Sequence, residues 1–247
     1  MPIRTARLRC RLPASASLAD SVAASIPVTD RGGFRRRVEV LVDGAADALG
    51  DTNRARETAL PAARLVIQRC GSAIKAVHRL DGDAAQRYLA EAGAELVRAH
   101  AAVADQPIIA HAGFLSDAEK EYAEARCLVA IVANEPIPDA GDLGISASAW
   151  LRGLAEAASE LRRHLLDRLR ADDPERADEL FAAMEDVYDA LMTVDFPDVV
   201  TGGLRRTLDA LRAVIERTRS DLTTTTLQRR LQLALELASS AESAAGV

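Results

Sequence analysis

Apolar residues at helical spacing are the feature that most constrains how this chain can fold. From Phe34 onward they recur every three or four residues, as in the stretch from Leu60 to Val77, which is the pattern of a helix with one buried face. Strand-like segments do not alternate with helical ones, and no turn dipeptide joins two strand-like runs as in a hairpin. Aromatic residues make up only 3% of the chain, which disfavours β-rich folds. The sequence therefore predicts an all-α fold.

The predicted helices follow one another with short breaks. Their expected ranges are 60–77, 83–103, 116–132, 146–170, 174–192, 203–219 and 222–239. Ser116, with Glu119 three residues later, predicts a capping box at the start of the third helix. The stretch from Asn134 to Gly144 is expected to be a loop, because Pro, Gly and Asp cluster there.

Charge and cysteine content exclude several classes of protein. The net charge of −6 is wrong for a protein that binds nucleic acid by bulk electrostatics, so any such role must rest on local arginine patches. No apolar run approaches the ~20 residues of a membrane span, and we expect no membrane partner. Cys10, Cys70 and Cys127 form no CxxC pair, which favours a reducing, cytoplasmic location over a disulfide scaffold or a thiolate zinc site.

The N-terminal segment differs from the rest of the chain. Residues 1–33 are rich in Arg, Ser and Ala, and four arginines precede the first acidic residue, Asp20. We expect a flexible arm here, followed by a single helical domain over residues 34–247. A transit peptide or an incorrectly assigned start are the alternatives for this segment.

Two acids in the third predicted helix are unusually placed. In the sequence EYAEA, Glu121 falls inside the apolar arc of the helix and Glu124 at its edge, whereas Glu119 points away from that arc. A carboxylate on a core-facing stripe is costly unless it has a partner. Glu121 therefore indicates either a metal or catalytic site, or a buried ion pair.

Two further acids, Glu156 and Glu160, lie four residues apart in the next long helix. They lie opposite its apolar face, on the same side as Arg152 and Arg163. The pattern alone is typical of a solvated face with i,i+4 ion pairs. If this face lines a water-filled cavity, four carboxylates on two facing helices suit a hard cation such as Mg²⁺ or Mn²⁺.

A basic flank runs beside the apolar stripe of the first predicted helix. Such a face can follow a phosphate backbone, although an ordinary solvated helix face has the same pattern. No GxSxG or GxxxxGK[ST] sequence is present, so nucleophilic hydrolysis and P-loop chemistry have no support. The flank consists of Arg64, Gln68, Lys75, His78 and Arg79.

Five stretches, taken in order, resemble the translin and translin-associated factor X family over about residues 60–233. They are AARLVIQRCGSAIKAVHR, HAGFLSDAEKEYAEA, WLRGLAEAASELRR, DFPDVVTGGLRRTLDALRAVIERTR and LQRRL. The resemblance implies a seven-helix bundle that assembles into hollow homo-oligomers, alone or with a related subunit, and encloses single-stranded RNA or DNA.

The resemblance also implies site residues. In the factor X branch, acids on two helices bind Mg²⁺ and cleave RNA inside the cavity. The EYxEA motif supplies Glu121 and Glu124, and Glu156 stands where the family usually has aspartate, with Glu160 as a further ligand or general base. Arg152 and Arg163 become candidate phosphate contacts, together with the basic flank. The expected function is thus a Mg²⁺- or Mn²⁺-dependent endoribonuclease. The alternatives are a non-catalytic nucleic-acid-binding ring and a purely structural oligomer.

Overall fold

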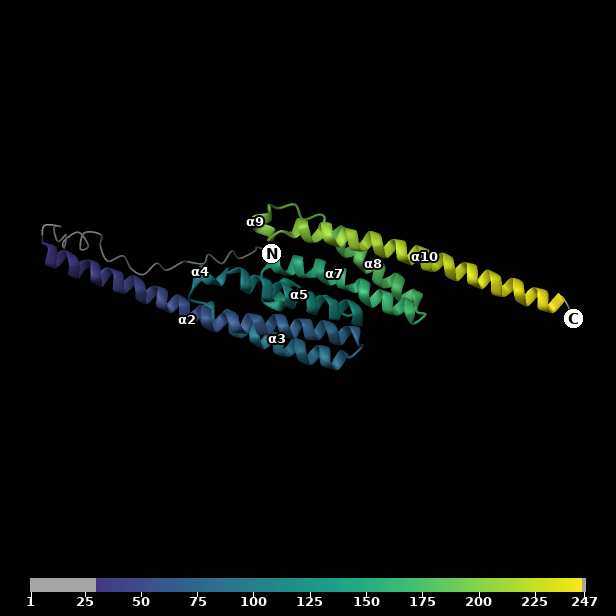
Figure 1. Cartoon of the computed structure of the whole chain (residues 1–247), viewed down its shortest axis with the longest axis horizontal. Helices are drawn as coiled ribbons and strands as arrows, with labels where there is room; N and C mark the ends of the chain where they lie inside the picture. Colours follow the sequence, from purple (N-terminus) through teal and green to yellow (C-terminus); the bar gives the residue numbers. More distant parts are fainter. Residues whose placement is uncertain (1–29, 246–247) are drawn as a thin grey trace, which may run out of the picture. The chain divides into compact units, whose positions relative to one another are not determined.

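The computed structural model describes residues 30–245, and the side-chain surroundings up to residue 239. The described part contains helices and loops without strands, so the all-α prediction is confirmed. No described helix has both the length and the apolarity to cross a bilayer. The helices are α2 (Arg31–His78), α3 (Gly82–Val103), α4 (Pro107–Ala110), α5 (Gly113–Ala133), α6 (Ala140–Leu143), α7 (Ala147–Arg170), α8 (Pro174–Leu191), α9 (Asp198–Thr201) and α10 (Leu204–Ala245) (Figure 1).

The chain divides into two units at residue 51. In the first unit, the described residues form the N-terminal part of α2, where the side chains of Phe34, Val38 and Leu41 are exposed. Most of the predicted arm, including Cys10, lies outside the described residues, while α2 already begins at Arg31. The predicted boundary at residue 34 stays a prediction.

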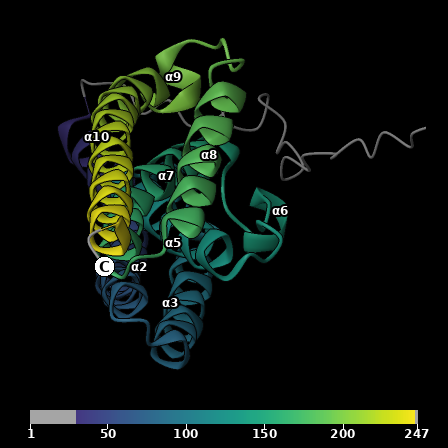
Figure 2. The same cartoon turned by 90° about the vertical axis from the view of Figure 1, so that its right-hand side faces the viewer.

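The second unit, from Thr52 onward, is built around two apolar clusters that share α5. One cluster joins the remainder of α2 to α3 and the first half of α5. The other joins α7, α8 and α10 to the second half of α5 and to the adjoining ends of α2 and α3 (Figure 2). Small side chains bring these helices close together, since much of the core is alanine. The largest fully buried side chains include Leu89, Leu115, Leu128, Leu161, Leu180, Met184 and Leu211.

The two predicted C-terminal helices, 203–219 and 222–239, form the single helix α10. Neither Ser220 nor Asp221 interrupts the helix. The Asp221 carboxylate accepts a hydrogen bond from Arg162 of α7 at 2.7 Å, so it does not compete for the backbone of its own helix. The predicted break was therefore wrong.

The predicted loop from Asn134 to Gly144 contains the short helix α6. A capping box forms there, because Asp139 accepts from the backbone N–H of Asp142 at 2.8 Å and the Asp142 side chain accepts from that of Asp139 at 3.1 Å. The rest of this stretch is loop as predicted, with turns at Asn134 and Gly144.

The predicted capping box of Ser116 and Glu119 is wrong. Helix α5 begins at Gly113, and its N-cap residue Ala112 makes no side-chain cap. Glu119, expected to point away from the core, is buried, and it accepts hydrogen bonds from the backbone N–H (3.2 Å) and hydroxyl (2.6 Å) of Ser146. His100 of α3 contacts its other oxygen at 2.9 Å. Glu119 thus ties α3 and α5 to the start of α7.

Candidate metal centre

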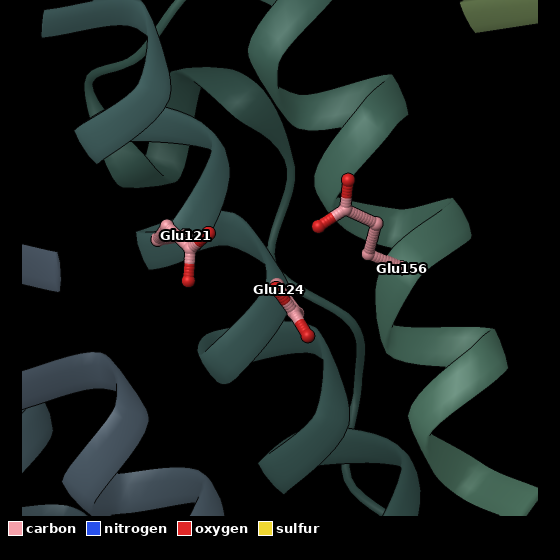
Figure 3. Close-up of side chains that lie close together, drawn as sticks. All are labelled: Glu121, Glu124 and Glu156. Atoms are coloured by element: carbon pink, nitrogen blue, oxygen red, sulfur yellow. The ribbon is translucent and has the colours of Figure 1, made fainter. Parts of the chain in front are cut away.

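Three glutamates from two helices converge on one point in the second unit. Glu121 and Glu124 lie about one turn apart on α5, and Glu156 reaches toward them from α7 (Figure 3). One carboxylate oxygen from each lies within 4.8 Å of the other two. All three residues are partly buried. Three of the four predicted acids therefore come together, and their oxygens are close enough to one another to bind one cation.

A close crossing of α5 and α7 at Gly153 brings these acids together. A Cβ atom at residue 153 would lie 2.5 Å from the Cβ of Ala123 and 2.6 Å from the carbonyl oxygen of Lys120. Real Cβ contacts are essentially never shorter than 3.0 Å, so only glycine allows this approach. Glu156 follows Gly153 by three residues and therefore projects from the part of α7 nearest to Glu124.

Lys120 lies among the glutamates and was not anticipated from the sequence. Its Nζ donates to Glu156 Oε2 at 2.5 Å and lies 3.1 Å from Glu121 Oε1. Burial lowers the pKa of this ammonium, but the hydrogen bonds and charges of Glu156 and Glu121 outweigh burial and raise the pKa overall. The partner that the position of Glu121 required is thus a lysine in this structure.

Glu124 holds its proton near neutral pH. Burial raises its pKa to about 8, and the charges of Glu121 and Glu156 act in the same direction, partly offset by Lys120. A carboxylic acid must lose its proton to bind a metal ion. Cation binding at this cluster is therefore expected to be coupled to proton release.

We expect this coupling to give a clear pH dependence. Because the pKa of Glu124 is raised from 4.5 to about 8 on folding, the folded protein binds more protons between these values, and without metal its stability falls as pH rises through this window. Metal affinity should rise over the same window. Titration calorimetry with Mn²⁺ in buffers of different ionisation enthalpy should count about one proton released near neutral pH. Release of no proton contradicts this expectation.

Glu160, the fourth predicted acid, is paired with a histidine beside the cluster. Its Oε1 lies 2.6 Å from His78 Nε2. The His78 side chain is only 3% exposed, whereas that of Glu160 is 34% exposed. The Glu160 charge also raises the pKa of Glu124, as a smaller contribution after burial and the charges of Glu121 and Glu156. Glu160 is therefore near the three glutamates and still open to solvent.

Comparisons with known proteins place the chain in a family. No protein-family profile matches the chain. The uncharacterized protein MJ0175 of Methanocaldococcus jannaschii is 29% identical over 178 residues, which covers 71% of this chain and 78% of that protein. The structure of AfC3PO bound to duplex RNA matches with a TM-score of 0.71 and 30% identity, over 76% of this chain and 97% of that chain. The chain belongs to the translin/C3PO family.

Two further C3PO structures agree with this assignment. A second crystal structure of AfC3PO gives the same TM-score of 0.71 and the same 30% identity, over 76% of this chain and 98% of that chain. Apo-NeC3PO shares the fold, with a TM-score of 0.66 at 19% identity over 75% of this chain and 96% of that chain. The translin/C3PO fold is therefore common to all three, and the sequence relationship is clearest with AfC3PO.

The basic flank of this translin/C3PO protein lies on α2. Arg64, Gln68, Lys75 and Arg79 are exposed there, as a surface contact with nucleic acid requires. His78 differs, because its side chain is buried and bonded to Glu160. A direct nucleic-acid contact by His78 would require its side chain to leave this buried position, whereas its neighbours on the flank are already exposed; the contacts of all five residues stay predictions.

The two predicted arginines of α7 also differ from each other. Arg163 is exposed and stays a candidate phosphate contact. Arg152 donates to the Ser116 hydroxyl at 2.8 Å and to the Ser148 carbonyl at 3.3 Å, and its Nε lies 3.0 Å from where a Cβ of residue 202 would be. Arg152 therefore joins α7 to α5, and we no longer assign it to phosphate binding.

Proposed function

We propose that this translin/C3PO protein binds RNA and cleaves it with a divalent cation held by Glu121, Glu124 and Glu156. The observation that carries the proposal is the convergence of these three carboxylates from α5 and α7 within 4.8 Å. AfC3PO, at 30% identity, has been solved in complex with duplex RNA, which supports RNA as the ligand class.

The donor set suits a hard cation. All three side chains offer carboxylate oxygens, the ligands that Mg²⁺ and Mn²⁺ prefer. Partial burial strengthens the attraction between these charges and a cation. When bound, such an ion polarises a phosphate oxygen and lowers the pKa of a bound water.

We assign to Glu160 the role of accepting the proton of the attacking water. His78 holds Oε1 of this carboxylate, and the other oxygen, Oε2, has no hydrogen-bond partner among the described residues. Because His78 Nε2 fixes the rotation of the carboxylate, Oε2 stays in a defined position as the base. Glu160 thus acts as general base, and His78 positions it.

The exposed residues of the α2 flank supply the proposed RNA contacts. Reversing Arg64, Lys75 and Arg79 to glutamate should weaken single-stranded RNA binding and reduce the slope of log K against log salt by about 2, since each lost phosphate contact contributes about 0.7. Fluorescence anisotropy at several salt concentrations measures both. The matched control reverses three exposed arginines of α10, Arg206, Arg212 and Arg217.

An unchanged salt slope in the α2 variant, or an equal loss in the α10 control, means that the flank is only a solvated helix face. If the parent protein shows no salt-dependent binding of a short single strand, the purely structural oligomer is favoured.

The catalytic part is tested by cleavage of RNA by size-fractionated protein. We propose that the active form is a homo-oligomer larger than a dimer, because a core rich in alanine buries little area per residue and assembly adds stability. Light scattering gives the mass of each fraction.

Fractions that contain the oligomer should cleave unstructured RNA when Mg²⁺ or Mn²⁺ is present, and EDTA should stop the cleavage. Duplex RNA is tested in parallel. RNA that is bound but never cut supports the non-catalytic ring.

A further inference from the structure

Lys120 contacts two of the three carboxylates that would hold a cation. Its Nζ lies 2.5 Å from Glu156 Oε2 and 3.1 Å from Glu121 Oε1, so one ammonium bridges α5 and α7. The lysine ammonium is a compact point charge with three donors, which makes it the side chain most like a metal cation in shape and charge density. Lys120 therefore occupies the electrostatic position of the proposed cation.

Glu121 and Glu156 cannot bind the ammonium and a divalent cation at full strength together, because each carboxylate carries a single charge. The negative charge of Glu156 is already partly neutralised by Lys120, because its Oε2 accepts a charge-assisted hydrogen bond from Nζ at 2.5 Å. A divalent cation binds carboxylate oxygens at about 2.0–2.1 Å in the case of Mg²⁺, and it requires those oxygens to turn toward it. Entry of the cation therefore requires Nζ to withdraw from Glu121 and Glu156.

Withdrawal of Nζ is physically inexpensive here. The Lys120 side chain is not fully enclosed, since 15% of it is exposed, and its flexible four-carbon stem allows the ammonium to turn toward solvent while the stem stays packed. An arginine with a planar, bidentate contact would be held more firmly. Displacement therefore does not leave a buried unpaired charge, which would cost several kcal/mol.

We infer that Lys120 is a built-in counter-ion of the glutamate cluster which a divalent cation displaces on binding, so that this lysine sets the metal affinity of the site. The inference rests on the proposed function for the metal site. The effect of Lys120 on metal affinity can nevertheless be measured without RNA cleavage.

The experiment measures Mn²⁺ affinity by titration calorimetry and thermal unfolding with and without Mn²⁺. Lys120→Met removes the charge and keeps the length of the side chain, and Lys120→Gln is a polar second variant in case the first misfolds. Arg170→Met is the matched control, because it also removes one positive charge, from the end of α7, where the Arg170 side chain is 84% exposed.

Both Lys120 variants should bind Mn²⁺ at least about tenfold more tightly than the parent, because no ammonium competes for the oxygens. The EDTA-treated variants should unfold at a lower temperature, and Mn²⁺ should raise that temperature more than in the parent. Arg170→Met should match the parent in both measurements. Unchanged or weaker Mn²⁺ binding by both Lys120 variants overturns the inference.

The result separates this inference from the proposed function. Tighter Mn²⁺ binding by the Lys120 variants, with no RNA cleavage by any form, supports the counter-ion role and refutes the nuclease. RNA cleavage by a parent whose Mn²⁺ affinity does not respond to Lys120 supports the nuclease and overturns the counter-ion role. If neither the parent nor the variants bind Mn²⁺, the metal site itself is refuted, and the inference fails with it.

Discussion

Glu121→Gln should abolish metal-dependent RNA cleavage while leaving the protein folded and able to bind RNA. Glutamine keeps the shape of the side chain and removes the charge that a cation requires. Mn²⁺ affinity should fall by more than about a hundredfold, since even residues that only support metal ligands cost 10–100-fold when lost. Calorimetry, cleavage of unstructured RNA and anisotropy measure the three properties on one preparation.

The alternative to this prediction is that Glu121 is only a structural ion-pair residue, and the position of Lys120 sets the stability expected of Glu121→Gln. After Glu121→Gln, the ammonium of Lys120 keeps its contact with Glu156, so the loss of stability should be only about 1 kcal/mol. The matched control is Glu175→Gln at an exposed position of α8. A Glu121→Gln protein that unfolds far earlier, from a parent that Mn²⁺ does not stabilise, identifies Glu121 as a structural ion-pair residue.

Gly153→Ala should destabilise the protein and disrupt the metal site together. The new methyl group would lie 2.5 Å from the Cβ of Ala123 and 2.6 Å from the carbonyl oxygen of Lys120, so α5 and α7 must move apart. Overpacking of this kind costs about 1–3 kcal/mol, and here it exceeds the gain of about 1 kcal/mol in helix propensity. Separation of the helices should also weaken Mn²⁺ binding, because Glu156 moves away from Glu121 and Glu124.

Gly71→Ala is the matched control for this substitution. Gly71 lies within α2, and a Cβ there would meet nothing within 4 Å. The same change should therefore stabilise the protein by up to about 1 kcal/mol and leave Mn²⁺ affinity unaltered. Thermal unfolding and calorimetry compare the pair. Equal stability changes in the two variants contradict the close crossing at Gly153.

The helices were predictable because their signals are local. The apolar spacing of the stretch from Leu60 to Val77 and the start of α8 at Pro174 depend on residues only a few positions apart. The spacing of Glu121 and Glu124 likewise places both on one side of α5, and the position of Glu121 on an apolar arc correctly required a cationic partner.

The details of the site depend on contacts between helices, which single-helix patterns do not contain. Lys120 follows the buried Glu119 and precedes Glu121, and only the position of α7 brings Glu156 to its Nζ. Glu119 has the sequence pattern of a capping box, yet its partners come from α3 and α7. Gly153 carried the one usable signal, because an isolated glycine within a strong helix pattern often marks close packing.

The most direct measurement of the central claim is an anomalous difference map from crystals soaked in Mn²⁺. It locates the ion without relying on catalysis, and the carboxylates of α5 and α7 are its predicted ligands. The account predicts one strong peak per chain, bounded by Glu121, Glu124 and Glu156, which is absent from crystals of Glu121→Gln. A map with no peak at this cluster, from protein that binds Mn²⁺ in solution, contradicts it.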